Sequence, residues 1–171
     1  NSILTLPNYT ALRTLTKYNH DIVIVDDWTY TGPDGNTYTT LGGVFKRTHD
    51  RTITENGGTN IIGLDGAKWE RDWDKIHVQP EWWECGGYDH LGQNYVNKNT
   101  SANGIYSESD RLNSAARLVL AGTSSKVVLQ KRLYLIDRQI VFVNTDGNGA
   151  TLRTVRPATT TNTVAYTAGQ N

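Results

Sequence analysis

The sequence of 171 residues carries seventeen basic and seventeen acidic side chains, so its net charge at neutral pH is zero. It has no run rich in lysine or arginine, which argues against nucleic-acid binding, because such binding depends on clustered positive charge. Its apolar runs are too short to span a bilayer, and a single cysteine excludes an internal disulfide. Five tryptophans, nine tyrosines and sixteen glycines fit a β-rich protein with many turns.

The first half of the sequence predicts one short helix followed by strands. Tyr9, Leu12 and Leu15 recur at three-residue spacing after Asn8, which is suited to cap a helix N-terminus. The expected strands and turns are β-branched or Thr/Tyr-rich segments separated by Gly, Asn and Pro, namely strands at 22–25, 42–47 and 59–64 and turns at 33–36 and 56–58. Residues 1–79 therefore predict a small β-rich N-terminal domain with a leading helix.

The stretch WERDWD raises the question of glycoside hydrolysis, which needs two carboxyl groups about 5–10 Å apart on the two sides of a sugar. On a strand, Glu70, Asp72 and Asp74 share one face at a spacing of about 7 Å. Trp69 and Trp73 then point to the opposite face, away from the acids. We therefore favour a solvated polar face over a buried tryptophan pair, and we expect no catalytic residue there.

The segment EWWECGGYDH, residues 81–90, has the densest chemistry in the sequence. Cys85 and His90 are not accompanied by the paired ligands that a structural zinc site needs, and no oxyanion-binding device accompanies them for nucleophilic catalysis. We expect Cys85 to pack as a small buried side chain. Glu84, Asp89 and His90 are interpreted as surface or hydrogen-bonding residues, and no metal or other cofactor is expected.

The second half, residues 80–171, predicts a helix and then short strands. The helix is expected at 109–121, with Asp110 near its start in a capping-box pattern and one apolar face formed by Leu112, Ala115, Ala116 and Val119. From Lys126 onward, strands of three to five residues alternate with brief polar turns, which is typical of a parallel β-helix and also of a small sandwich. The sequence stops in mid-pattern, so we expect a truncated chain.

The order of these motifs resembles the N-terminal portion of bacteriophage tailspike proteins of the pectate-lyase-like, right-handed β-helix type. The matching motifs of the first half are Gly42-Gly43-Val44-Phe45, Asn56-Gly57-Gly58-Thr59 and Trp69-Glu70-Arg71. Those of the second half are Trp82-Trp83-Glu84-Cys85-Gly86-Gly87, the Ser109-Asp110 helix, Val127 to Leu129, Tyr134 to Ile136 and Gly147-Asn148-Gly149-Ala150-Thr151-Leu152. The sequence departs from the family at Trp83, where a phenylalanine is usual, and in a longer loop at 92–104.

The resemblance implies a mainly β fold, with a small N-terminal β-domain, a capping helix and the first coils of a right-handed parallel β-helix. It implies a homotrimer in the extracellular virion, attached to other tail or baseplate proteins, whose full-length form binds a bacterial surface polysaccharide. Catalytic residues in the family usually lie farther along the β-helix or between subunits, so no catalytic residue is expected in this chain, and the sequence leaves open whether the parent is a depolymerase. Neither nucleic acid nor membrane insertion is expected.

Within that architecture we interpret residues 81–87 as the structural junction between the two parts. Trp82 and Trp83 are expected to anchor the crossing, one pointing inward and one toward a partner chain, while Gly86 and Gly87 let the chain turn and Cys85 fills a gap. The capping helix would use Asp110, Leu112, Ala115, Ala116 and Val119.

Two other classes of function remain open at this point. One is a secreted bacterial polysaccharide lyase or hydrolase on the same scaffold. The other is a non-catalytic carbohydrate-binding β-domain, in which exposed Trp or Tyr side chains, Trp82 and Trp83 first among them, serve as sugar platforms.

Overall fold

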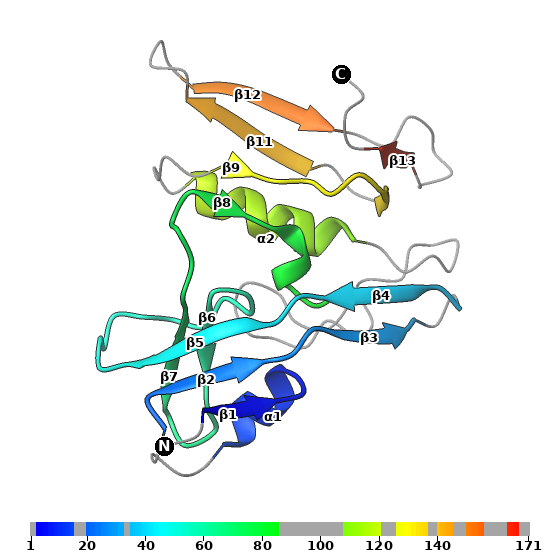
Figure 1. Cartoon of the computed structure of the whole chain (residues 1–171). Coiled ribbons are helices and arrows are strands. Elements are labelled where there is room, and N and C mark those ends of the chain that lie inside the picture. Colours follow the sequence, from blue (N-terminus) through cyan, green and yellow to red (C-terminus); the bar gives the residue numbers. More distant parts are fainter. Residues whose placement is uncertain are drawn as a thin grey trace.

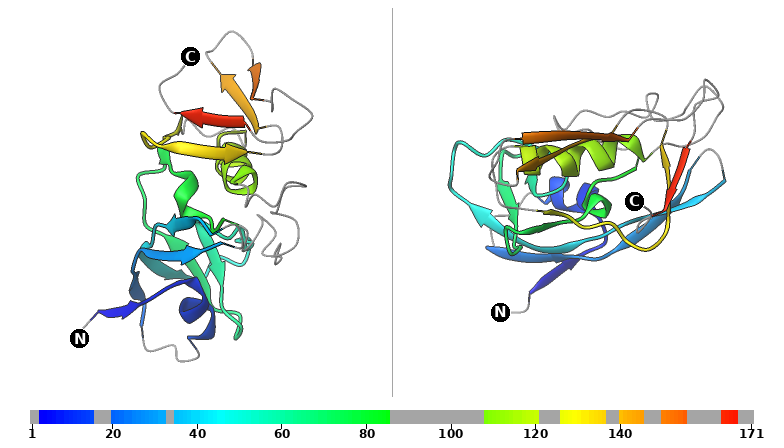
Figure 2. Two further views of the ribbon diagram at one scale, coloured as in Figure 1. Left: turned by 90° about the vertical axis from the view of Figure 1, so that its right-hand side faces the viewer. Right: turned by 90° about the horizontal axis from the view of Figure 1, so that it is seen from above.

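The computed structural model describes residues 3–15, 20–32, 35–85, 108–120, 126–136, 140–145, 150–155 and 164–167. The described chain is mainly β, with two α-helices and one short 3-10 helix. Figures 1 and 2 show its layers: a twisted sheet near the N-terminus, a helix across the middle, and a group of strands beyond that helix. In the described part, no helix is long and apolar enough to cross a membrane.

The N-terminal layer is a five-stranded sheet in the order β1-β2-β5-β7-β6. Its strands are β1 (Leu4–Leu6), β2 (Ile22–Val25), β5 (Gly43–Thr48), β6 (Asn60–Ile62) and β7 (Lys68–Arg71). β1 is parallel to β2, and the other neighbours are antiparallel. The predicted strand at 59–64 ends early because Gly66 N–H donates to Gly63 C=O at 2.9 Å, which turns the chain back into β7.

Helix α1 (Tyr9–Thr14) packs against this sheet. Asn8 caps it as expected, since the Asn8 Oδ1 accepts a hydrogen bond from Ala11 N–H at 2.9 Å. The core between helix and sheet consists of Tyr9, Leu12, Val23, Val25, Phe45, Ile61, Ala67 and Trp69. Buried residues alternate along β2 and β7, so one face of each strand meets the helix.

Two features of the sheet's surroundings were predicted from turn residues. Strands β3 (Trp28–Thr31) and β4 (Thr37–Thr40) form an antiparallel ribbon that extends from the sheet (Figure 1), and Gly35 in the connection has a φ of 79°. At the second turn, the Asn56 Oδ1 accepts hydrogen bonds from the N–H groups of Gly58, Thr59 and Asn60 at 2.9–3.0 Å. The asparagine thus fixes the turn that leads into β6.

The chain leaves the sheet through β8 (His77–Val78) and the 3-10 helix η1 (Pro80–Trp82). Helix α2 (Ser109–Leu120) forms close to its predicted range and is followed by β9 (Lys126–Val127). β8 and β9 pair in parallel, with Val128 N–H donating to Val78 C=O at 2.8 Å. Helix α2 therefore lies in the connection between two parallel strands.

The strands after β9 pair differently from the parallel coils expected from the sequence. β10 (Leu133–Ile136) is antiparallel to β13 (Val164–Thr167), and β11 (Ile140–Thr145) is antiparallel to β12 (Ala150–Val155). Within the described residues, parallel pairing of this region occurs only between β8 and β9, so a right-handed β-helix is not seen. Short strands of this kind fix neither their partners nor their direction, because both depend on residues far along the chain.

Candidate functional site

The predicted junction lies where η1 meets the N-terminal sheet, and both of its tryptophans are buried within this chain. Trp82 is 7% exposed and Trp83 is 1% exposed, so neither points to a surface where it would meet a partner chain. The Trp83 Nε1–H donates to Asn56 C=O at 2.6 Å, and its ring lies against Gly58. The position of Trp83 therefore depends on the predicted turn at 56–58, whose glycine leaves room for the ring.

Tyr9 and Arg71 join the sheet to the same junction. The Tyr9 hydroxyl donates to Trp82 C=O at 2.5 Å, and it accepts a hydrogen bond from the Arg71 Nη2. The Arg71 guanidinium lies between two rings, 4.8 Å from the centroid of Phe45 and 4.7 Å from that of Trp82. Burial raises the pKa of Tyr9 and lowers that of Arg71, because both charged forms lose hydration.

The remaining hydrogen bonds of Arg71 go to backbone carbonyl oxygens rather than to a carboxylate. Its Nε–H donates to Gly58 C=O at 3.0 Å, Nη2 also donates to Leu41 C=O at 3.2 Å, and Nη1 donates to Gly42 C=O. The side chain is thereby tied to two loops, one at residues 41–42 and one at Gly58. We name Tyr9, Arg71, Phe45 and Trp82 the aromatic–arginine cluster.

Cys85 and the segment after it were predicted to fill and turn the junction. Cys85 is buried beside Tyr38, and the Tyr30 hydroxyl donates to its carbonyl oxygen. Burial raises the pKa of the thiol to about 12, which keeps the sulfur neutral at physiological pH and unsuited to nucleophilic attack. Gly86, Gly87, Asp89 and His90 lie outside the described residues. Glu84 is half-buried, and burial raises the pKa of its carboxyl group.

Helix α2 is buried on two sides rather than along the single apolar face that the sequence suggested. Ala115 packs with Val78, Trp82 and Trp83, whereas Leu112 packs with the side chains of the strand layer beyond the helix. Ala116 is also buried, and Val119 is half-buried. Asp110 lies in the first helical turn. The helix consequently bridges the junction and the following strands.

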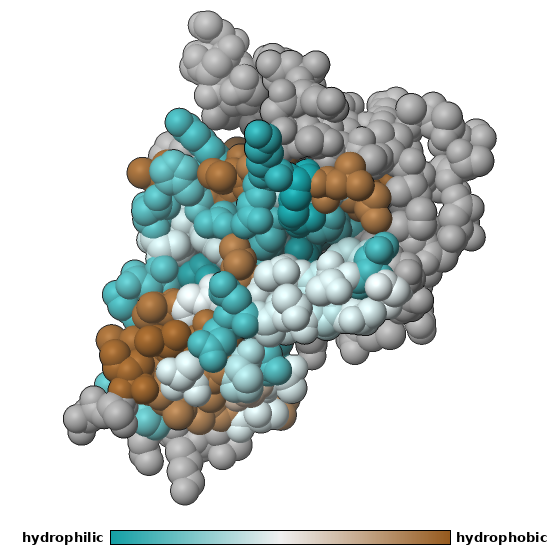
Figure 3. All heavy atoms as spheres, turned by 45° about the vertical axis from the view of Figure 1, so that its right-hand side comes forward, coloured by the Kyte–Doolittle hydropathy of each residue, from teal (hydrophilic) through white to brown (hydrophobic). Residues whose placement is uncertain are grey.

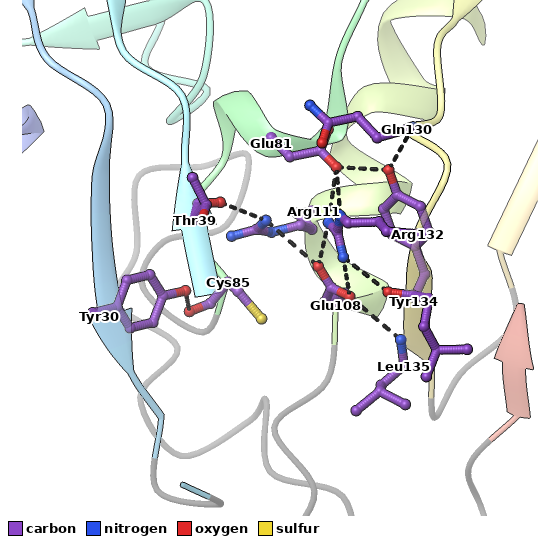
Figure 4. Close-up of polar contacts among 11 residues, drawn as sticks. Tyr30, Thr39, Glu81, Cys85, Glu108, Arg111, Gln130, Arg132, Tyr134 and Leu135 are labelled. Carbon is purple, nitrogen blue, oxygen red and sulfur yellow. Dashed lines mark hydrogen bonds and ion pairs between the residues drawn. The ribbon is translucent and has the colours of Figure 1, made fainter. Parts of the chain in front are cut away.

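A set of charged residues that the sequence did not indicate accompanies this bridge (Figure 4). Arg132, on the segment entering β10, donates through Nη2 to the Glu81 Oε1 at 2.8 Å and to the Glu108 Oε1 at 2.7 Å. Its Nη1 donates to the Glu108 Oε2 at 3.0 Å. Glu81 and Glu108 are each 2% exposed. We name Glu81, Glu108, Arg132 and Tyr134 the ion-pair cluster, since it links η1, the start of α2 and β10.

The electrostatics of the ion-pair cluster follow from its burial. The Tyr134 hydroxyl donates to the Glu81 Oε1 at 2.6 Å. Burial is the main cause that raises the pKa of Tyr134, and this hydrogen bond is the second. Burial alone would lower the pKa of Arg132, but the hydrogen bond and charge of Glu108 outweigh it and raise the pKa overall. Arg111 lies behind the cluster, 3.5 Å from Glu108, and donates to Thr39 C=O at 3.0 Å.

The acidic residues of WERDWD are solvated, as expected, and each has a basic neighbour. Glu70 pairs with Lys75 at 2.6 Å, Asp72 with Lys46 at 3.0 Å, and Asp74 with His77 at 2.5 Å. Trp69 is in the sheet core, and Trp73 packs edge-on against Trp82. Among the described residues, no group of three or more His, Cys, Asp or Glu side chains is arranged to hold a metal ion.

Comparison with known proteins gives a partial structural likeness. No protein-family model matches the sequence, and no curated protein matches it significantly. The tailspike protein of Acinetobacter baumannii phage AM24 is similar with a TM-score of 0.45 and 25% identity over 66% of this chain. Full-length tailspike protein 2 of Escherichia coli O157:H7 bacteriophage CAB120 is similar with a TM-score of 0.44 and 22% identity over 67% of it. The chain covers only 15% and 12% of those two proteins.

Proposed function

We propose that the chain is a segment of a phage tailspike or tail-fibre protein, in which it assembles subunits, anchors the protein to the tail and caps a β-helix. The observation that carries this proposal is the position of α2, which lies between the five-stranded sheet and the later strands (Figure 1) and is buried on both sides. A strand layer ending without such cover would expose unpaired N–H and C=O groups. The ordered tailspike-like motifs of the sequence support the family assignment.

The parallel pair β8–β9 supports the capping role further. Parallel strands need a long crossover connection, and here that connection contains α2. In a longer parent protein, a further parallel strand would pair with the edge of β9 that does not pair with β8. This part of the proposal requires the strands after β9 to pair in parallel in the parent, instead of antiparallel as in the described chain.

Light scattering on the purified chain tests the assembly role. The expected mass is three times the 19.1 kDa of one chain. A mass of one chain at every concentration would contradict assembly by this segment.

A binding experiment separates attachment to the virion from attachment to the host. The chain should bind phage particles that lack tailspikes, and it should not bind purified bacterial surface polysaccharide, a role that the proposal assigns to the rest of the parent. The opposite result would favour a carbohydrate-binding domain. That alternative now lacks its expected sugar platforms, since Trp82 and Trp83 are buried.

A further inference from the structure

A groove of about 370 Å³ opens between strand β4 and the segment that enters β10. Residues 36–39 and Leu41 line one side, Arg132, Leu133 and Leu135 line the other, and Glu81 and Glu108 contribute as well. We name it the edge groove. In the space-filling view, a pale band of residues of intermediate hydropathy lies between a brown apolar patch and a teal hydrophilic region (Figure 3). Most residues that line the edge groove are polar or charged, and Leu41, Leu133 and Leu135 are the apolar ones.

The register of the β3–β4 ribbon determines which backbone groups of β4 face the groove. Gly32 N–H donates to Asn36 C=O at 2.9 Å, and the ladder continues with Tyr38 opposite Tyr30. Backbone groups of successive residues point to opposite edges of a strand, so those of Asn36 and Tyr38 bond to β3. The backbone groups of Thr37 and Thr39 consequently point to the other edge, into the groove.

Two groups on this outer edge of β4 are already bonded. Leu41 N–H donates to Glu81 C=O at 2.7 Å, and Thr39 C=O accepts the hydrogen bond from Arg111. Within the described part of the chain, Thr37 N–H, Thr37 C=O and Thr39 N–H have no hydrogen-bond partner on this edge. An edge with free donors and acceptors is a template for a further strand.

The opposite wall of the groove is also a strand edge. The Leu135 N–H donates to the Glu108 Oε2 at 3.3 Å, and the Leu135 C=O accepts a hydrogen bond from the Glu108 N–H at 2.8 Å. This edge of β10 therefore faces away from β13. Leu133 has the same orientation, and this residue is 51% exposed. Among the described residues, its N–H has no hydrogen-bond partner. Two strand edges therefore face the same groove.

The charges in the groove indicate what else an occupant would carry. Glu81 and Glu108 supply two carboxylates among the lining residues and Arg132 supplies one guanidinium, while the buried Arg111 lies 3.5 Å from Glu108, so the four charges balance. The Glu81 Oε2 is buried and has no hydrogen-bond partner in the described structure, although its Oε1 is bonded to Arg132 and Tyr134. A buried carboxylate oxygen without a donor is unfavourable, and a basic group would complete the set.

We propose that the edge groove binds an extended segment of a partner polypeptide as an added β-strand, with a lysine or arginine of that segment directed to Glu81. Backbone hydrogen bonds to Thr37 and Thr39 would supply the affinity, and the carboxylates would select the basic side chain. The proposal goes beyond the proposed function, because it assigns a specific surface and a specific class of partner segment. It holds whether the chain is a monomer or a trimer.

Titration of the isotopically labelled chain with the peptide acetyl-Thr-Val-Lys-Val-Thr-amide, followed by NMR, tests the proposal. The amide signals of Thr37, Thr39 and Leu133 should shift. The same peptide with glutamate in place of lysine, and one with N-methyl groups on alternate residues, should bind about tenfold more weakly. Equal binding of all three peptides would overturn the proposal. A parallel titration in which maltohexaose shifts these signals and the lysine peptide does not would overturn it as well.

A matched pair of proline variants tests the strand edge from the protein side. Thr37→Pro removes one N–H from the outer edge of β4, whereas Thr31→Pro removes one from the far edge of β3, because the two residues are paired in the ribbon. We expect Thr37→Pro to weaken binding of the lysine peptide about tenfold and Thr31→Pro to leave it within about twofold. Equal affinities would contradict the proposed edge. Should circular dichroism show either variant unfolded, the N-methylated peptide gives the same test on the unchanged chain.

Discussion

The two arginine clusters of this protein hold the junction in opposite ways. In the aromatic–arginine cluster, Arg71 is 4% exposed and bonds to carbonyl oxygens and a phenol. In the ion-pair cluster, the Arg132 side chain is 32% exposed and bonds to two carboxylates that are themselves buried. The first cluster stabilises a buried cation with dipoles and rings, and the second stabilises two buried carboxylates with a partly exposed cation.

The difference matters for how each cluster depends on its members. Carbonyl groups cannot be removed by substitution or titration, so the aromatic–arginine cluster fails mainly through Arg71 itself. In the ion-pair cluster, loss of Arg132 leaves Glu81 buried without a cation, and loss of Glu108 leaves the buried Arg111 without its ion pair. The variants below separate the two cases, from the largest expected effect to the smallest.

Replacing Arg71 with methionine should have the largest effect, a loss of about 4 kcal/mol in the free energy of unfolding. Methionine keeps the packing between Phe45 and Trp82 but leaves three carbonyl oxygens without a donor. Urea denaturation at pH 7 measures the loss. Tyr9→Phe, which removes only the hydroxyl shared by Arg71 and Trp82, should cost about 1–2 kcal/mol. A methionine variant as stable as the unchanged chain would show that the cation is dispensable.

Replacing Glu108 with glutamine should cost about 2–3 kcal/mol, less than the Arg71 change because Arg132 retains Glu81 and partial hydration. The double variant with Arg132→Gln should recover about 1–2 kcal/mol relative to the sum of the single changes. Both values come from denaturation curves at low salt. Strict additivity would show that the two residues do not interact, and Lys46→Gln at the exposed pair with Asp72 provides a control of small effect.

A Gly58→Ala change tests the support of Trp83 and should cost about 2–3 kcal/mol. A Cβ at this position would lie 2.2 Å from the Trp83 ring, which has no flexible end to move aside. Gly66→Ala is the matched control: its Cβ meets open space, and its φ of 84° alone should cost about 1 kcal/mol. Thermal unfolding of the two variants compares them, and equal melting temperatures would contradict the steric argument.

The sequence predicted the elements that local patterns specify and missed pairings that depend on distant residues. The β-branched run Ile22–Val25, the cap at Asn8 and the apolar spacing in 109–120 are local signals, and the corresponding strand and helices form there. The antiparallel pairing of β10 with β13 depends on segments about thirty residues apart, which no local pattern specifies.

The candidate site was harder to predict than the fold for the same reason. Arg132 lies 24 residues from Glu108 and 51 from Glu81, so no motif spacing connects them. Glu81 lies in the segment 81–90, but no local pattern in the sequence identifies Arg132 as its partner. The sequence offers only a weaker signal for the ion-pair cluster. Glu108 directly precedes α2 and Arg132 directly precedes β10, and both elements contain apolar residues.

The smallest expected effect concerns the exposed pair of Asp74 and His77. Hydrogen bonds from the His77 backbone and side chain lower the pKa of Asp74 to about 2. A carboxyl group whose pKa is lowered by folding stabilises the fold above its unfolded pKa of about 3.9, and this contribution disappears as the pH falls through 2. Asp74→Asn keeps an acceptor for the N–H groups of Ile76 and His77 but removes the charge. The stability difference between the unchanged chain and the variant should therefore shrink as the pH falls from about 4 to about 2 in parallel denaturation series. A difference that persisted at pH 2 would assign the effect to hydrogen-bond geometry rather than to charge.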